Sequence, residues 1–289
     1  MLSATLWGTR GSIPVSGDEY RRYGGSTTCI EIRVHDAAEG TPRVLVIDCG
    51  TGMSNLGRQW GDRGDELTIL QTHMHWDHIQ GFPFFGPLFN PKGRYRFMST
   101  PRQGHTMKET VYRQMSQPNL PFTLDMVPCT VDFEDIEQIG ETQMGELRVS
   151  WVEVGHPFGC TTYRFDYRGH SLVFATDIEL AETDMVSFEG HCRDADLLIM
   201  DSQYFPEEYV GRRGFGHSSV VDCVQHARNC GVSRLLLTHH DPGHDDETLD
   251  RKLVLARETA AGALEVEIAH DGLTVNVERA VGQSAAVAS

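Results

Sequence analysis

The sequence is poor in positive charge, paired cysteines and long apolar runs, and each shortage excludes a class of protein. Its 25 Lys and Arg residues stand against 41 Asp and Glu residues, which gives a net charge of −16. Binding to a long nucleic acid depends on basic side chains that release counterions from phosphates, so an acidic chain is a poor candidate for it. A small phosphorylated substrate stays open, because a metal ion can supply positive charge locally.

Signals for membranes and secretion are also missing from the sequence. No stretch of about 20 apolar residues occurs, so we expect no transmembrane helix. The N-terminus has no basic start followed by an apolar run, so we expect no secretory signal. The seven cysteines are scattered and never spaced Cys-x-x-Cys, which argues against a disulfide framework and against a Cys-based zinc site. These features predict a reduced, cytoplasmic protein without a membrane partner.

Length and patterning predict a single α/β domain over residues 1–281, followed by a flexible tail of small residues at 282–289. Apolar or alternating runs predict strands in two series: 5–7, 29–34, 44–48 and 67–72, then 147–154, 161–167, 171–176, 197–201, 234–238, 264–269 and 273–277. Helices are expected at 105–117, 220–230 and 247–259.

Between the two series lies a stretch rich in proline and aromatic residues, at about 82–131. We interpret it as an insertion into the domain. Long irregular segments often cover a site, so it is either a packed surface insertion or a lid. The sequence alone leaves both interpretations open.

The densest group of chemically active residues is Thr72-His73-Met74-His75-Trp76-Asp77-His78. It follows the apolar run 67–70, so a strand that ends there would release the histidines into a loop. Imidazole and carboxylate side chains suit Zn, Mn or Fe. Further ligands should then follow other strands at the same edge of a sheet. His156, Asp177 and His239 each come directly after a predicted strand.

The run His-Met-His-Trp-Asp-His resembles the H-x-H-x-D-H signature of the metallo-β-lactamase-fold hydrolases. Three Gly-rich segments, 6–14, 24–29 and 47–52, are similar to those of the phosphodiesterase branch of that family. This branch includes transfer-RNA 3′-end nucleases and small cyclic-phosphate and cyclic-nucleotide phosphodiesterases. The resemblance runs from about residue 5 to residue 277. It implies an α/β fold, a four-layer αββα sandwich with two mixed sheets face to face and helices outside.

The resemblance also implies a site for two divalent metal ions, with Zn or Mn the first expectation and Fe open. One ion would be held by His73, His75 and His156, the second by Asp77, His78 and His239, and Asp177 would bridge them. A water shared by two cations loses a proton near neutral pH and becomes the nucleophile. We prefer His239 to the adjacent His240 as the last ligand, because it follows Leu-Thr as the last ligand of the family does.

The same resemblance suggests a proton donor and substrate contacts. Asp201 and His217 stand where the nuclease branch has an acidic residue and a histidine that is thought to protonate the leaving oxygen. This chain has Asp where that branch has Glu, and the alternative is a histidine hydrogen-bonded for structure alone. Arg10, His240 and His244 are candidate substrate contacts, although each is equally consistent with a structural turn.

The leading hypothesis is therefore a hydrolase of a small phosphodiester, with a cyclic nucleotide as the best candidate and with Asp77, His217 and Asp201 as catalytic residues. The alternative is a thioester, lactone or β-lactam, since the fold hosts several reactions. Transfer-RNA processing is less favoured by the resemblance, because the nuclease branch holds its substrate with a long arm between the positions that match His156 and Asp177, and here only 20 residues separate the two. A non-catalytic module is disfavoured by the complete ligand set. A homodimer is possible by resemblance.

Overall fold

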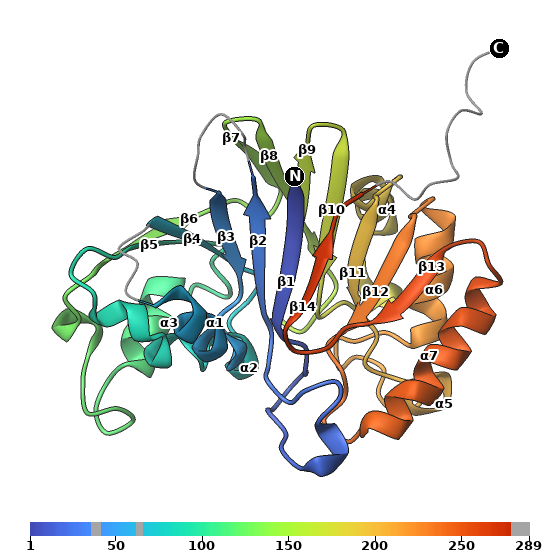
Figure 1. The fold of residues 1–289 in the computed structure, drawn as a ribbon, viewed down its shortest axis with the longest axis horizontal. Coiled ribbons are helices and arrows are strands. Elements are labelled where there is room, and N and C mark those ends of the chain that lie inside the picture. The colour runs from blue at the N-terminus through green and yellow to red at the C-terminus, as the bar shows by residue number, and fades with distance from the viewer. Residues whose placement is uncertain (36–41, 62–65, 279–289) are drawn as a thin grey trace.

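The computed structural model of the protein describes residues 1–35, 42–61 and 66–278. The expected tail at 282–289 lies outside the described residues. The described chain forms two seven-stranded sheets that face each other, with helices on both outer sides (Figure 1). The four-layer αββα sandwich expected from the sequence is therefore confirmed.

The first sheet has the strand order β14-β1-β2-β3-β4-β5-β6. Its strands are β1 (Leu2–Gly8), β2 (Cys29–Val34), β3 (Arg43–Ile47), β4 (Glu66–Gln71), β5 (Arg94–Ser99), β6 (Thr130–Asp135) and β14 (Leu273–Asn276). Strands β3 to β6 are parallel, and the pairs from β14 to β3 are antiparallel. The strand predicted at 273–277 thus returns to the first sheet, where it lies beside β1 (Figure 1).

The second sheet has the strand order β13-β12-β11-β10-β9-β8-β7. Its strands are β7 (Gly140–Met144), β8 (Leu147–Val154), β9 (Cys160–Tyr167), β10 (His170–Ala175), β11 (Leu197–Asp201), β12 (Arg234–Thr238) and β13 (Glu265–Ile268). Strands β10 to β13 are parallel, and β7 to β10 are antiparallel. Strand β8 therefore points the same way as β10 and β12, and all three end at one edge.

Helices cover the outer face of each sheet. The helices are α1 (Gly52–Trp60), α2 (Trp76–Ile79), α3 (Met107–Gln114), α4 (Met185–Cys192), α5 (Pro206–Tyr209), α6 (Val220–Asn229) and α7 (Asp246–Ala260). Short 3-10 turns are η1 (Asp18–Tyr20), η2 (Phe82–Phe84), η3 (Gly86–Phe89), η4 (Leu124–Met126) and η5 (Leu180–Glu182). We call the first sheet with α1–α3 the first half, and the second sheet with α4–α7 the second half.

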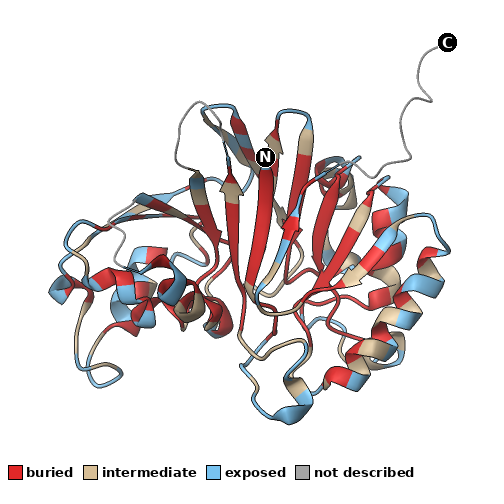
Figure 2. Ribbon diagram, in the orientation of Figure 1, coloured by how far each residue is buried: buried red, intermediate tan, exposed pale blue. Residues whose placement is uncertain are grey.

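Alternation along the strands separates three apolar clusters. On β11, Leu197 and Ile199 face the layer between the two sheets, whereas Leu198 and Met200 face the helices of the second half. Central strands such as β10 and β11 are buried on both faces, which is why they read as continuous apolar runs (Figure 2). A third cluster lies between the first sheet and its helices. Together the clusters form the three interfaces of a four-layer sandwich.

The stretch at 82–131 is not simply an insertion. Its residues 94–99 form β5, which pairs with both β4 and β6, and the side chains of Tyr95 and Phe97 belong to the core of the first half. Helix α3 contributes Met107 and Val111 to the same cluster. The segment is therefore an integral part of the first half, because removing it would expose that core.

Two expectations about absences can be compared with the structure. Within the described ranges, no helix is long and apolar enough to cross a membrane. All seven cysteines are described, and each is free, so the chain has no disulfide framework.

Candidate metal centre

The loop after β4 carries four of the expected ligands. His73 and His75 lie in the extended part, and α2 starts directly after His75, so Asp77 and His78 sit on its single turn. The whole loop is anchored by Asp48. Its carboxylate accepts hydrogen bonds from the Thr72 backbone N–H at 2.8 Å and from His78 Nδ1 at 2.7 Å. The first half thus delivers its ligands from one short, well-held segment.

The second half delivers its ligands from three separate loops. His156 follows β8, Asp177 follows β10 and His239 follows β12, so all three stand at carboxyl ends of strands. Asp177 and His239 have φ angles of 53° and 56°, in the left-handed region that non-glycine residues rarely adopt. Strained backbone of this kind clusters at functional sites, where the surrounding fold holds it in place.

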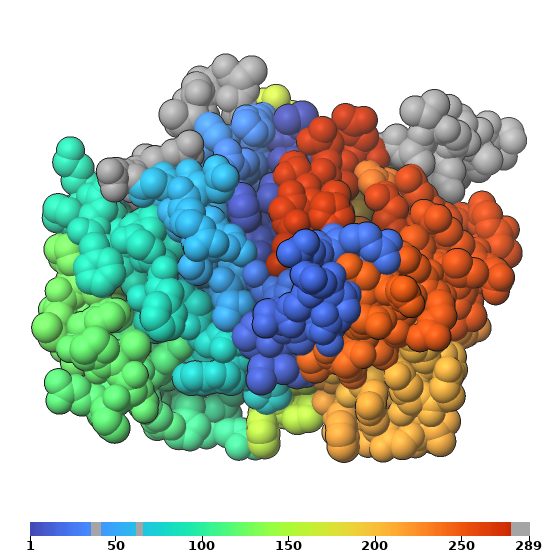
Figure 3. Space-filling model, turned by 60° about the horizontal axis from the view of Figure 1, so that its bottom comes forward, coloured from blue at the N-terminus to red at the C-terminus, as the bar shows by residue number. Residues whose placement is uncertain are grey.

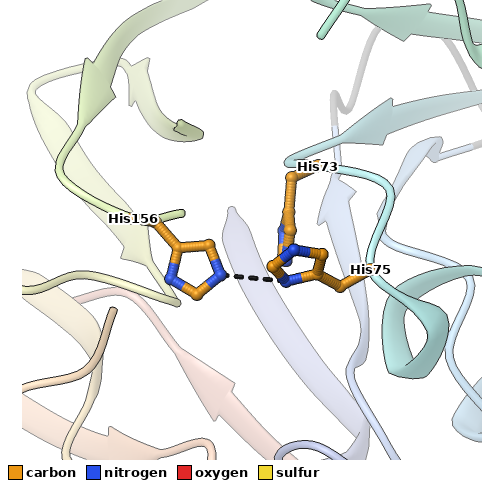
Figure 4. A group of neighbouring side chains, drawn as sticks. All are labelled: His73, His75 and His156. Carbon is orange, nitrogen blue, oxygen red and sulfur yellow. Dashed lines mark hydrogen bonds between the residues drawn. The ribbon is translucent and has the colours of Figure 1, made fainter. Parts of the chain in front are cut away.

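His73, His75 and His156 form the first ligand group. Each offers a ring nitrogen, and these nitrogens lie within 4.8 Å of one another. His156 Nε2 is 3.0 Å from His75 Nδ1, and Figure 4 shows the rings of the two halves turned toward a common point. Three imidazoles that converge in this way can bind a metal ion and leave a further coordination position open.

Asp77, His78 and His239 form the second ligand group. One atom from each side chain lies within 4.8 Å of the others, and all three residues are buried. The backbone N–H of Ser12 donates to Asp77 Oδ2 at 2.7 Å. The N-terminal segment therefore closes this position, and in Figure 3 that segment (blue) lies between the first half (cyan to green) and the second half (orange).

Asp177 stands between the two groups. Its Oδ1 is 3.7 Å from Nε2 of both His73 and His156. Its Oδ2 is 3.1 Å from Nε2 of His78 and 3.2 Å from Nε2 of His239. The two oxygens of one carboxylate therefore face different groups, which is the arrangement that a bridge between two cations requires.

The buried donor atoms fit a metal. Nε2 of His73, His78 and His239 is buried and makes no well-directed hydrogen bond, and its nearest polar neighbours are carboxylate oxygens of Asp77 and Asp177. Unpartnered polar atoms in an interior are costly, so three at one point indicate a missing partner such as a cation. The opposite ring nitrogens are held by outer partners: His73 Nδ1 by the Thr72 hydroxyl, His78 Nδ1 by Asp48, His156 Nδ1 by the Gly216 carbonyl and His239 Nδ1 by Gln203 Oε1. Such partners orient metal-binding imidazoles.

The two groups differ in their electrostatics. Burial lowers the pKa of His156 to about 4 and that of His73 well below its ordinary value, so both imidazoles are neutral and can donate a lone pair. Burial by itself would lower the pKa of His239 as well, but Asp177 and Asp77 together raise it to about 9. Burial would raise the pKa of Asp77, yet His78 and His239 hold it well below its usual range. The pKa of His78 is likewise raised, by Asp177, Asp77 and Asp48, so the second position pairs an ionised carboxylate with imidazoles that hold their protons, and a cation binding there would displace those protons.

Asp201 and His217 form a pair beside both groups. His217 Nδ1 is 2.7 Å from Asp201 Oδ2, and the His217 ring stacks on His239 with centroids 5.0 Å apart. A nitrogen of His217 also lies within 4.8 Å of the donor atoms of His156 and Asp177. Ser219 caps α6 through the Asp222 N–H, which fixes the chain just after His217. The structure therefore brings this pair to the centre.

Three candidate substrate contacts lie elsewhere. Arg10 is fully buried, and its guanidinium donates to the carbonyls of Gly24, Asp241 and His244, so it ties loops together and cannot reach a substrate phosphate. His240 is also fully buried, and its Nε2 pairs with the Ala269 carbonyl. The expectation that Arg10 or His240 touches substrate is wrong. The structure places His239, and not His240, at the centre.

His244 also serves structure. Its Nε2 is 2.9 Å from Glu208 Oε1, and 5% of its surface is exposed. The side chain holds the loop after β12 against α5, so the suggested substrate contact is not supported.

Sequence reasoning missed three residues that support the centre. Asp48 orients His78, and Gln203 meets His239 Nδ1 at 3.2 Å. Glu179 accepts the backbone N–H groups of Gly214 and Gly216, and so holds the loop whose Gly216 carbonyl orients His156. Asp48 lies in the Gly-rich segment 47–52, which was a signal. Nothing in the sequence pointed to the other two.

Comparisons with known proteins agree with this picture. A family model described as "Beta-lactamase superfamily domain" matches residues 43–240. A ribonuclease Z of Myxococcus xanthus (strain DK1622) is 36% identical over 279 residues, covering 81% of this chain and 88% of that protein.

Two solved structures share the fold. The metallo-β-lactamase-fold protein YhfI from Bacillus subtilis has a TM-score of 0.68 at 17% identity, covering 95% of this chain and 98% of that one. A diphosphatase of the PhnP family has a TM-score of 0.67 at 18% identity, covering 96% and 99%.

Proposed function

The chain belongs to the family of beta-lactamase superfamily domains, and from this premise we propose that it is a metal-dependent hydrolase of a small phosphodiester. The observation that carries the proposal is the position of Asp177, whose two oxygens face two separate ligand groups. Two bound divalent ions would supply an activated water and stabilise the charge that develops on the phosphoryl oxygens. Zn and Mn suit these ligands, and Fe is a further candidate.

Side chains of the chain itself donate a proton and hold the candidate metal position in place. His217 is held through Nδ1 by Asp201, which leaves Nε2 as the atom that gives its proton to the leaving oxygen. Proton donation of this kind accelerates a reaction by roughly 10²–10⁴. Asp77 carries negative charge at the second position and fixes its geometry through the Ser12 N–H. We propose as metal ligands the residues of the two groups and the carboxylate between them: His73, His75, Asp77, His78, His156, Asp177 and His239.

A compact substrate is supported by the connection between His156 and Asp177. Most of the residues between them belong to the paired strands β9 and β10. That connection carries no extended arm for an RNA. With the net charge of −16, this favours a nucleotide-sized diester, and a cyclic nucleotide is the first candidate.

A second candidate is RNA 3′-end processing. It is favoured by one observation, the 36% identity to the ribonuclease Z of Myxococcus xanthus. A direct comparison of a cyclic-nucleotide panel with a precursor transfer RNA carrying a 3′ trailer separates the two candidates. Faster turnover of the precursor would contradict the small-substrate proposal while leaving the metal centre intact.

The first experiment is hydrolysis of bis(p-nitrophenyl) phosphate by protein reconstituted with Mn²⁺ or Zn²⁺, with Asp77→Ala as the matched variant. We expect metal-dependent release of nitrophenol by the wild type. The variant should lose one of two metal ions and nearly all turnover, yet keep its circular dichroism spectrum. Near-wild-type turnover by the folded variant would overturn the ligand assignment. No turnover by a wild type that holds two metal ions would redirect the search to thioesters and lactones.

A further inference from the structure

A cavity of about 280 Å³ opens beside the first ligand group. His73 and His75 form part of its wall, so it is continuous with the candidate metal centre. We call it the basic pocket, because its lining includes Arg102, Arg113 and His105 and no acidic residue. In a chain with a net charge of −16 this composition is unexpected, and it makes the pocket a place for a negatively charged group.

Helix α3 holds the backbone of Arg113 close to the candidate metal centre. The Thr110 hydroxyl contacts Met74 Sδ at 3.1 Å, and Gln114 Nε2 donates to the Ile79 carbonyl at 2.9 Å. Both contacts join α3 to the loop that carries the first-half ligands. Arg113 lies between them in sequence and lines the pocket, so its guanidinium is carried on a backbone held against that loop.

Arg102, which lines the basic pocket, is held in place by its own partners. Arg102 is 8% exposed, donates to the Thr161 hydroxyl at 2.7 Å and forms an ion pair with Glu153. Its charge is therefore already balanced by a carboxylate. The more exposed Arg113 and His105 are left as the groups that a ligand can reach, the Arg113 guanidinium as a cation and the His105 imidazole, whose Nδ1 lies 4.0 Å from Glu109 Oε2, as a hydrogen-bonding group.

Phe158 supplies an aromatic surface at the same pocket. Its side chain is 62% exposed, and its φ of 71° lies in the left-handed region, between Pro157 and Gly159. A turn closed by the Gly159 N–H on the His156 carbonyl holds it there. The ring lies edge-on to His75, with centroids 6.4 Å apart. The strained backbone thus holds an exposed aromatic ring beside His75, a candidate metal ligand. Such a ring can stack against a flat aromatic group of a bound molecule.

We propose that the basic pocket binds a nucleoside monophosphate unit of the substrate, with the base against Phe158 and the phosphate against Arg113 and His105. The volume lies near the lower end of the range for small-ligand pockets and suits a single nucleoside unit. The inference rests on the proposed phosphodiester function and narrows it. Among cyclic nucleotides, the preferred substrate is one that carries a second phosphate besides the diester at the proposed metal centre.

Equilibrium binding tests the pocket without any turnover. The probes are adenosine 3′,5′-bisphosphate, adenosine 5′-monophosphate and inorganic pyrophosphate, each titrated into Mn²⁺-loaded protein by calorimetry. We expect the wild type to bind the bisphosphate about tenfold more tightly than the monophosphate, since a second charge-assisted contact is gained. Arg113→Gln should abolish that preference. Phe158→Leu should weaken both nucleotides about tenfold and leave pyrophosphate unchanged, because stacking is lost.

Two control variants match these substitutions outside the pocket. Phe84→Leu changes a phenylalanine that is also 62% exposed, and Arg21→Gln changes an exposed arginine on the N-terminal segment. Both should bind all three probes as the wild type does. Equal affinity of the wild type for bisphosphate and monophosphate would overturn the proposal, as would Arg113→Gln and Phe158→Leu variants that bind like the wild type. Failure to hydrolyse bis(p-nitrophenyl) phosphate refutes the proposed function instead, so the two failures are distinguishable.

Discussion

The two halves of the molecule build the metal centre in different ways. The first half places four ligands within six residues on one loop, from His73 to His78. The second half contributes three ligands that are 21 and 62 residues apart in sequence, one at the end of each of β8, β10 and β12. A local cluster needs only a loop with the right turn, whereas dispersed ligands need the whole mixed sheet to bring the ends of β8, β10 and β12 to one edge.

The halves also differ in how the ligands are held. In the first half one buried side chain, Asp48, anchors both the Thr72 backbone and the His78 ring. In the second half two different loops orient the ligand rings: the Gly216 carbonyl contacts His156 Nδ1, and the Gln203 side chain contacts His239 Nδ1. Two of its ligands also require left-handed backbone. The candidate ligands of the first half are therefore close together already in the sequence, whereas those of the second half come together only when the sheet and its loops fold.

The largest effect should come from the second-half residue that touches both groups. Asp177→Asn removes the charge that faces both positions, so we expect the loss of both metal ions and a fall in kcat of at least about a thousandfold. Metal analysis and turnover of bis(p-nitrophenyl) phosphate check this. Asp166→Asn, a second-half carboxylate on β9, is the control and should behave as the wild type. Two tightly held ions in Asp177→Asn would refute the bridging position.

The next effect separates chemistry from metal binding. His217→Ala should leave metal content unchanged and lower kcat by roughly 10²–10⁴ for a substrate with a poor alkoxide leaving group. For a p-nitrophenol leaving group the loss should be much smaller, because that group departs without a proton. His170→Ala, on the exposed start of β10, is the matched control. Equal losses for both leaving groups would mean that His217 is a structural residue.

A smaller effect should follow from weakening the first-half anchor. Asp48→Asn keeps the shape but loses the charge that orients His78, so we expect metal affinity at the second position to fall about 10- to 100-fold. Competition with a chromophoric chelator measures this for each ion separately. Asp132→Asn, an exposed residue on β6, should leave both affinities unchanged. Equal weakening of both ions would show that Asp48 supports the whole loop and no single position.

The smallest effect concerns acid stability of the second half. His226 stacks on Phe188 with centroids 4.6 Å apart, and burial lowers its pKa to about 4. The unfolded chain takes up a proton near pH 6.5 and the folded chain does not, so stability present above pH 6.5 is lost as pH falls toward 4.

Denaturant unfolding at pH 7 and pH 5 tests this. The wild type should lose about 2 kcal/mol more than His226→Gln over this interval, since the other groups titrate alike in both proteins. Parallel losses in the two proteins would show that His226 is protonated in the folded state.

Many strand positions could be predicted from the chain because buried strands read as apolar runs, whereas the four-layer sandwich followed from the resemblance to the metallo-β-lactamase-fold hydrolases. The predicted ranges at 29–34, 147–154, 197–201 and 234–238 agree with β2, β8, β11 and β12 residue by residue. Strands β5, β6 and β7 were missed. They lie toward the outer edges of the sheets, where charged residues such as Arg94 and Arg96 alternate with the apolar ones. The surrounding prolines flank β5 without interrupting it.

The sequence by itself determined the chemistry of the proposed metal centre. Four candidate ligands of two residue types, His and Asp, lie within six residues, and three more follow predicted strands, which allows few other interpretations. Only the tertiary structure decided which neighbours support them. It turned His239 toward the other candidate ligands and His240 away from them, buried Arg10, and brought Asp48 and Gln203 to the ligand rings. The physical reason is that residue type sets what an atom can bind, whereas backbone conformation and long-range packing set which atoms meet.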